Sequence, residues 1–377
     1  MTKYITINQK VVAPKLKSSF MKKASYIILS FLMIAVVDAY SQDLDYSQFY
    51  NNPTYYNPAN VGLTVGLKSR LNYRKQWTGL SGDYHTYSFS ADIADRSLPG
   101  AGGIGIIANQ SLAGKGTLKT NSFGIMPSVR IPVSRNTIFQ LGALASVVTQ
   151  QLNWENLVFS DELDPRWGNV NPTSFAGPAR ERVIYPDFSF GGIFQFQGNS
   201  MEGSIGAAVH HITTPNQSYF EVDAKLPRKY VYNLDFVITI NEEEGYYAKK
   251  KGFKLNPGLM VIHQASLMYY SFGMNIYMSH VYLGLWYKSQ SLEYADLSTL
   301  SAMVGINIPF NDESRMKLVY SYDMNVHTNT NFTGPSHEIS LIFEFDELRL
   351  MGNKSSNNNM MGPASKRSNS PIECSPF

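Results

Sequence analysis

Apolar and polar side chains alternate along most of the chain. In residues 230–240 the even positions are all large and apolar, whereas the odd positions include Asn233, Asp235 and Thr239. Residues 67–73 repeat the pattern, with polar side chains at the even positions. Because successive side chains of a strand point to opposite faces, this alternation predicts strands with one apolar and one polar face.

About fourteen such segments follow one another, and no stretch with a helical period separates them. They are residues 64–74, 84–93, 102–109, 118–130, 137–148, 184–196, 201–209, 229–241, 253–262, 266–277, 280–288, 300–309, 316–323 and 336–346. A typical length of about ten residues suits a tilted membrane strand. The pattern predicts an all-β protein, a transmembrane outer-membrane β-barrel of about 14 antiparallel strands over residues 64–346.

Composition supports the membrane interpretation. Only 16% of the 377 residues are charged, against about 25% in an ordinary soluble domain, while 44% are hydrophobic and 13% aromatic. This composition argues against a disordered chain, a coiled coil and a nucleic-acid-binding protein. A soluble pair of β-sandwiches or a propeller is the alternative, but it would need more charge on its exposed faces. The single cysteine, Cys374, excludes a disulfide framework.

The N-terminal region has the pattern of a signal peptide. Lys22 and Lys23 precede the apolar run 24–37, which is followed by small residues at a cleavage site after Ser41. The run is too short for a spanning helix, although a retained anchor is the alternative, and Met21 is a candidate start. Removal of residues 1–41 takes away six lysines and one acid, so the net charge falls from +3 to about −2.

Connection lengths predict the orientation of the barrel. Connections 149–183, 210–228, 289–299 and 324–335 are long and should be extracellular, whereas alternate ones such as 131–136 and 197–200 are short and should be periplasmic. Both termini would then lie in the periplasm. Residues 42–63, which contain two Asn/Pro turns, should form a compact segment in or against the barrel mouth. Residues 347–377 have the composition of a flexible periplasmic tail.

The sequence contains no recognisable catalytic motif, and we expect neither an enzyme nor a bound cofactor or metal. His337 and Glu338 lack the second histidine of a zinc-protease motif, and adjacent His210 and His211 would point to opposite faces of a strand. The glycines at 102–105 are not followed by a helical pattern, so a nucleotide-binding loop is not supported.

Several polar and aromatic segments near strand ends occur together in one order. They are Asn57–Ala59, Tyr73–Trp77, Pro186–Ser189, His211 with Pro215–Gln217, Leu226–Arg228, Tyr320–Asp323 and His337–Ile339. In this order they resemble the PorP/SprF family of Bacteroidetes outer-membrane proteins, over residues 48–345. The ending Cys374-Ser375-Pro376-Phe377 differs from the family's Cys-Pro-x-Phe-like end.

The resemblance implies an outer-membrane component of the type IX secretion system and gliding machinery. It implies that the chain anchors, or assists the secretion of, a large surface adhesin through the adhesin's C-terminal domain. Periplasmic ring components of the secretion system and outer-membrane lipid are further expected partners, and nucleic acid is not. A porin or small-solute transporter is the alternative function.

Five side chains on the expected outer side are candidates for contact with a protein partner. They are Trp77, Trp154, Trp167, His211 and His337. Aromatic residues often anchor interfaces, but an aromatic girdle at the membrane boundary explains the tryptophans equally well.

Overall fold

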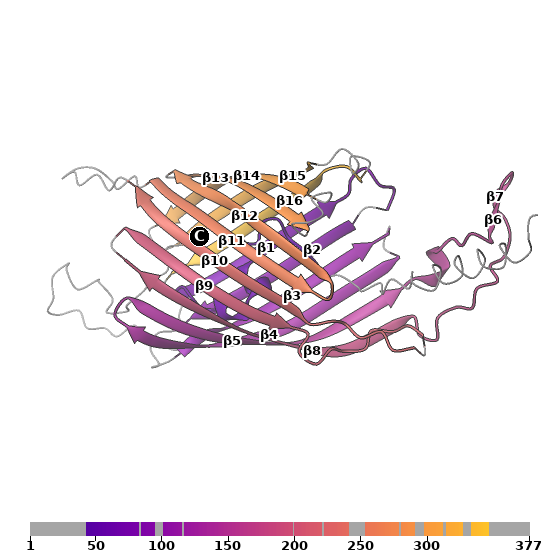
Figure 1. The fold of residues 1–377 in the computed structure, drawn as a ribbon, viewed down its shortest axis with the longest axis horizontal. Coiled ribbons are helices and arrows are strands. Elements are labelled where there is room, and N and C mark those ends of the chain that lie inside the picture. Colours follow the sequence, from indigo (N-terminus) through magenta and orange to yellow (C-terminus); the bar gives the residue numbers. More distant parts are fainter. Residues whose placement is uncertain are drawn as a thin grey trace, which may run out of the picture. The chain divides into compact units, whose positions relative to one another are not determined.

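The computed structural model contains a closed antiparallel β-barrel of fourteen strands. It describes residues 43–82, 84–94, 101–114, 117–198, 200–220, 222–240, 253–278, 280–290, 298–311, 314–326 and 333–346. The predicted signal peptide and tail therefore lie outside the described residues. Each barrel strand pairs with its neighbours along the chain, and β1 closes the barrel by pairing with β16. Figure 1 shows the steep tilt of the strands.

The strand bounds confirm the predicted segments, most of them slightly extended. The barrel strands are β1 (Gly66–Gln76), β2 (Tyr84–Ala94), β3 (Ala101–Ala113), β4 (Leu118–Ser134), β5 (Thr137–Leu152), β8 (Arg182–Gln197), β9 (Met201–His210), β10 (Lys229–Ile240), β11 (Phe253–Gln264), β12 (Leu267–Met278), β13 (Val281–Gln290), β14 (Ser298–Asn311), β15 (Ser314–Asn325) and β16 (Ser336–Phe345). A two-residue pair that the pattern did not predict, β6 (Leu163–Asp164) and β7 (Gly168–Asn169), lies in the connection after β5.

The two faces of the barrel wall have opposite chemistry. In β1, the side chains of Lys68, Arg70, Asn72 and Arg74 are buried on the inside, whereas Leu71 is 45% exposed on the outside. The other strands repeat this division, with an outer face rich in Ile, Val, Leu and Phe. An apolar outer band around a polar interior is the arrangement of a barrel in lipid. Among the described residues, no helix is long and apolar enough to cross a membrane.

The two ends of the barrel differ in their connections. We call one the long-loop end, where residues 153–181 join β5 to β8 and residues 211–228 join β9 to β10. The opposite, short-turn end contains the tight connections between β4 and β5 and between β8 and β9. The connections predicted to be long lie at one end and those predicted to be short at the other, although the β3–β4 and β11–β12 connections at the long-loop end are also short. The predicted polar exception, residues 242–252, lies outside the described residues.

The barrel lumen contains the segment before β1, residues 43–65, which we call the plug. It includes the short helix α2 (Pro53–Tyr56) and the 3-10 turn η1 (Pro58–Asn60), each with proline in its first turn. Asp43 contacts His211, Lys229 and Gln264 at the long-loop end, whereas Gly66 begins β1 at the short-turn end. The plug therefore runs along the lumen from one end to the other.

Candidate functional site

Most of the buried polar chemistry of the barrel is directed at the plug. Hydrogen bonds and ion pairs join the plug to β1, β2, β4, β5, β8, β9, β10, β11, β13, β15 and β16. The contacts fall into a charged cluster, a clamp at the long-loop end, an aromatic anchor and a group of backbone contacts. Together they fasten the plug on all sides of the lumen.

The charged cluster lies about three residues inside the long-loop end. Arg74 Nη1 is 2.7 Å from Asp323 Oδ2 and 2.9 Å from Glu338 Oε2, and all three side chains are buried. The plug completes the cluster, because the Ser47 hydroxyl donates to Asp323 and the Ser47 backbone N–H donates to Glu338. Two acids and one arginine leave a net negative charge, which plug donors stabilise.

Gln48 extends this cluster along the wall. Its side-chain amide donates to the Glu338 carbonyl oxygen at 2.9 Å and to the Ser321 hydroxyl at 3.1 Å. Its oxygen accepts from the side chain of Asn51 at 2.8 Å. A fully buried glutamine whose donors and acceptor are all engaged fixes the position of the chain around it.

The clamp at the long-loop end is built around Asp43. Its carboxylate lies 2.7 Å from His211 Nε2 and 2.9 Å from Lys229 Nζ, and the other ring nitrogen of His211 is 3.0 Å from Asp187. Burial opposes the charged imidazole, but the two carboxylates outweigh it and raise the pKa of His211 to about 9. Burial likewise opposes the charged form of Asp43, yet His211 and Lys229 hold its pKa well below the usual value. Asp45 pairs in the same way with Lys288 of β13.

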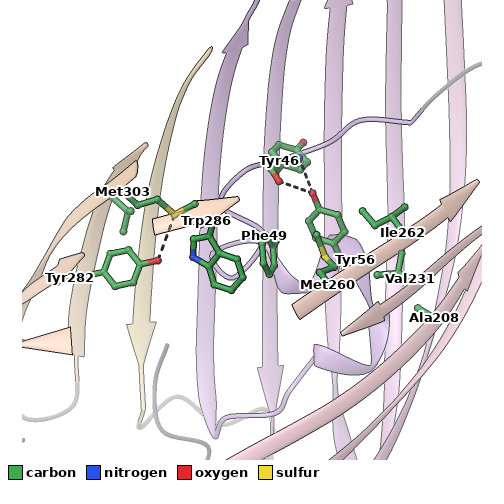
Figure 2. Close-up of a cluster of buried hydrophobic side chains, with 11 residues drawn as sticks. Tyr46, Phe49, Tyr56, Ala208, Val231, Met260, Ile262, Tyr282, Trp286 and Met303 are labelled. Carbon is green, nitrogen blue, oxygen red and sulfur yellow. Dashed lines mark hydrogen bonds between the residues drawn. The ribbon is translucent and has the colours of Figure 1, made fainter. Parts of the chain in front are cut away.

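An aromatic anchor fills the middle of the lumen. Figure 2 shows Phe49 of the plug between Trp286 of β13 and Tyr56, with Tyr46 beside Tyr56. The Phe49 and Trp286 rings meet edge-to-face at 4.9 Å, and the Trp286 N–H donates to Asn275 Oδ1 at 2.8 Å. The tryptophan is 2% exposed. Its indole nitrogen is therefore satisfied while its ring supports the plug.

Nearer the short-turn end, the plug backbone approaches the wall closely. Asn57 caps η1 by accepting from the Ala59 N–H at 2.9 Å, and its amide donates to the Gly192 carbonyl at 3.1 Å. Gln140 of β5 donates to the Ala59 carbonyl at 2.9 Å. A Cβ atom at Gly142 would clash with the backbone of Pro58, so this wall position requires glycine.

The motif residues near strand ends thus converge inside the barrel. Arg74, Asp187, His211, Asp323 and Glu338 come from separate sequence motifs, and each contacts the plug or a residue that does. The motifs identified the segments, but nothing in them predicted that their charged residues contact the plug. The sequence feature that could have indicated these contacts is the position of the charged residues on the polar side of each alternating pattern.

The structure places the two predicted histidines in different surroundings. His211 has a left-handed backbone (φ 56°) and belongs to the clamp, so its ring is engaged inside the protein. His337 lies on the outer face of β16, where the Tyr320 hydroxyl and His337 Nδ1 are 2.7 Å apart. The two residues do not form one site, and their roles in partner binding stay predictions.

The three predicted tryptophans lie at the long-loop end but in separate environments. Trp77 follows β1 and is 45% exposed beside Tyr84. Trp167 is 71% exposed in the turn between β6 and β7, and Arg166 stacks on its ring. Trp154 packs on Phe159 at 4.9 Å and contacts Phe220 of the β9–β10 connection at 6.4 Å. The two long connections therefore meet through aromatic side chains.

Within the described residues, no group of three or more His, Cys, Asp or Glu side chains is placed to hold a metal ion.

Comparison with known proteins gives one informative match. No curated protein matches the sequence. Among solved structures, the chain is similar to a Pseudomonas aeruginosa FadL homologue and to the P. putida toluene transporter TodX, each at 10% identity over 78% of this chain and a TM-score of 0.43, covering 94% and 93% of those chains. The β domain of the Bordetella autotransporter BrkA matches at 10% identity over 74% of this chain and 98% of its own, with a TM-score of 0.34. Similarity at this level indicates nothing about function.

The family comparison covers most of the chain. The model of the family described as type IX secretion system membrane protein PorP/SprF matches residues 38–343. These residues include the plug and nearly all of the barrel, and the polar lumen and apolar outer face agree with an outer-membrane location. The chain belongs to the PorP/SprF family of type IX secretion system membrane proteins and is an outer-membrane β-barrel.

Proposed function

We propose that this barrel anchors, or assists the secretion of, a large surface adhesin, and that it contacts the adhesin's C-terminal domain at the long-loop end. The observation that carries the proposal is the difference between the filled lumen and the long connections. The lumen is occupied by the plug, while the long connection with β6 and β7 extends beyond the strand ends (Figure 1). The long connections also contain exposed aromatic side chains. This arrangement favours a binding protein over a solute channel.

The outer contact surface would be the aromatic loop cluster, by which we mean Trp154, Phe159, Phe175 and Phe220. Phe159 and Phe175 are 5.0 Å apart, and Phe175 and Phe220 are 53% and 50% exposed. These side chains lie in loops rather than on the strand faces that meet lipid. Grouped apolar side chains exposed to water are typical of protein interaction sites.

Surface retention of the adhesin tests this proposal. We expect Phe175→Ser combined with Phe220→Ser to reduce adhesin at the cell surface, because both side chains would contact the partner. Leu80→Ser is the matched control, since Leu80 is an exposed apolar residue (37%) in the β1–β2 connection at the same end. If removal of the whole protein leaves secretion and retention of every type IX cargo intact, the proposal fails.

Periplasmic ring components are proposed as second partners. Residue 346 follows β16 at the short-turn end, so residues 347–377 continue from the expected periplasmic side. Co-purification of ring proteins with the detergent-solubilised protein should depend on residues 347–377. Equal recovery with and without those residues would place the ring contact elsewhere.

Planar-bilayer conductance separates the anchor from a porin. The intact protein should pass little current, because the plug bonds to the wall around the lumen. Deletion of residues 43–61 should raise the current by roughly tenfold or more, since a barrel of this size encloses a channel when nothing fills it. A large, steady current through the intact protein would favour the porin.

A further inference from the structure

A cavity of about 110 Å³ remains between the plug and the barrel wall. On the plug side it is lined by aromatic residues, including Phe49, Tyr50 and Tyr56, and on the wall side by Ile193, Met260 and Ile342. The wall residues Lys68, Gln195 and Ser204 also line it, and each is two or three residues from the short-turn end of its strand. The cavity therefore lies toward the expected periplasmic side of the lumen.

A row of polar side chains crosses one wall of this cavity. Gln195 of β8 pairs in register with Ser204 of β9, and Ser204 pairs with Asp235 of β10. Asp235 Oδ2 accepts from Asn233 at 2.8 Å and from the Ser204 hydroxyl at 3.4 Å. The row thus places an amide on β8 and a carboxylate on β10, with Ser204 of β9 between them on the inner face of the wall.

One acceptor atom of this row, Gln195 Oε1, has no partner within the part of the chain that the structure describes. It is inaccessible to solvent, and Gln195 as a whole is 7% exposed. A buried acceptor without a donor destabilises the structure around it. Because this oxygen and the Asp235 carboxylate line the same cavity, they indicate a site that is completed by a group rich in hydrogen-bond donors.

The plug contributes an aromatic ring to the same place. Tyr50 extends over Gly258, which neighbours Asp235 in register, and a Cβ atom at Gly258 would overlap the Tyr50 hydroxyl. Burial, followed by the nearby Asp235 carboxylate, raises the pKa of Tyr50 well above its usual value. The Tyr50 hydroxyl therefore stays protonated beside the carboxylate and donates a hydrogen bond to it.

The other charged side chains that line the cavity are already paired. Lys68 lies 2.7 Å from Glu344, and Arg70 lies 2.5 Å from Asp92. Among the described residues, the hydrogen-bond donors to Asp235 are Tyr50, Asn233 and Ser204, none of which is a cation. The negative charge of Asp235 is therefore the one that a ligand in the cavity would neutralise.

We propose that this cavity binds one ammonium or guanidinium group on a short apolar stem, as found in a lysine or arginine side chain of a peptide. The cation donates to Asp235 Oδ1 and Gln195 Oε1, and the stem packs between Tyr50 and Met260. A water-sized group needs roughly 10–15 Å³, so the cavity can hold such a side chain. The site is independent of the adhesin proposed above.

Two sources could supply this chemistry. One is the chain's own C-terminal region, since residues 347–377 contain Arg349, Lys354, Lys366 and Arg367 against two acids and follow β16 at the same end of the barrel. The other is a basic peptide of a periplasmic protein. Both sources present a lysine or arginine side chain, and a charge-removing variant of the C-terminal region distinguishes them.

Calorimetric titration of the full-length detergent-solubilised protein with butylammonium tests the site. Asp235→Asn should weaken binding at least about tenfold, because it removes the charge that pairs with the ligand. Gln195→Glu should tighten binding, a gain that a variant with a damaged fold would not show. Glu202→Gln is the matched control on β9, since Glu202 does not line the cavity, and butanol is the uncharged control ligand. Equal affinity of the wild type and Asp235→Asn overturns the proposal.

A full-length variant with Gln at positions 349, 354, 366 and 367 identifies the source. Tighter butylammonium binding in this variant than in the wild type assigns the site to the chain's own C-terminal region. Equal binding by the two proteins assigns it to an external peptide. Absence of binding in both overturns the proposal.

Discussion

The plug interface and the aromatic loop cluster have opposite construction. The plug is held by buried ion pairs and hydrogen bonds to most of the barrel strands, and its central ring partner Trp286 is 2% exposed. The loop cluster is joined by a few ring contacts and backbone bonds such as that from Arg180 N–H to the Tyr219 carbonyl, and its Phe175 and Phe220 rings are about half exposed. The first region therefore contributes to stability, whereas the second is available for recognition.

The difference follows from where water is excluded. Inside the lumen a charged side chain that lost its partner would stay desolvated, so the charges that hold the plug occur in pairs or clusters. In the loops a charge or ring can be hydrated, and its contacts contribute little to folding. Paired substitutions, one in each region, test whether the comparison holds.

Arg74→Ala should have the largest effect on stability. It leaves Asp323 and Glu338 buried together without their cation, which typically costs about 3–5 kcal/mol. The same change at Arg166, which is exposed and stacks on Trp167, should cost less than about 1 kcal/mol. Thermal unfolding of the detergent-solubilised barrel, followed by its heat-dependent gel migration, measures both. Equal shifts of the two variants would contradict the comparison.

The pH dependence of the clamp should have an intermediate effect. The pKa of His211 is raised to about 9 from an ordinary 6.5, so its ion pairs stabilise the fold fully below pH 6.5. This contribution, on the order of 3 kcal/mol from the size of the shift, is lost as the pH rises toward 9. His211→Gln should therefore lower the unfolding temperature at pH 6 and flatten its dependence between pH 6.5 and 9.

His263→Gln is the control for this prediction. His263 alternates with the buried Ile262 and Gln264 on β11, so it lies on the outer face away from the plug. Its replacement should leave the pH profile unchanged. A His211→Gln variant that keeps the wild-type pH profile would show that the clamp does not hold the plug.

The sequence was sufficient to predict the barrel wall. All fourteen strands could be placed because one face of each meets lipid and the other a polar interior, which imposes period two on segments such as residues 230–240. The pair β6–β7 was missed because two-residue strands leave no periodic signal. The strands of the wall can therefore be predicted from short segments of the sequence.

The plug could be predicted only in outline. The Asn/Pro turns indicated a compact segment at the barrel, but its partners are up to 291 positions away in sequence, as for Ser47 and Glu338. No local pattern records such pairings. At positions 142 and 258 a Cβ atom would overlap a plug residue, so the need for glycine there becomes visible only in the structure.

The starting point of the plug was not predicted. Parity predicted that both termini are periplasmic, and this stays a prediction, because residues 1–42 and 347–377 lie outside the described residues. The first described residue, Asp43, lies at the long-loop end. Connection lengths could not predict the position of Asp43, because the plug lies inside the lumen and does not connect two strands.

Trp167→Ala should have the smallest effect on stability. Its ring is 71% exposed and stacks only with Arg166 among the ring contacts of the described residues, so the free energy of unfolding should change by less than about 0.5 kcal/mol. Trp286→Ala, the matched substitution at the plug, should cost about 3–5 kcal/mol because it empties a packed site.

Retention of the adhesin on cells is the second measurement, and if the loops bind the adhesin the two variants should rank in the opposite order. Trp167→Ala should then weaken retention of the adhesin on cells while the barrel unfolds at the wild-type temperature. A destabilised Trp167→Ala barrel would instead mean that the loops are part of the fold's support, and the distinction between the two regions would fail.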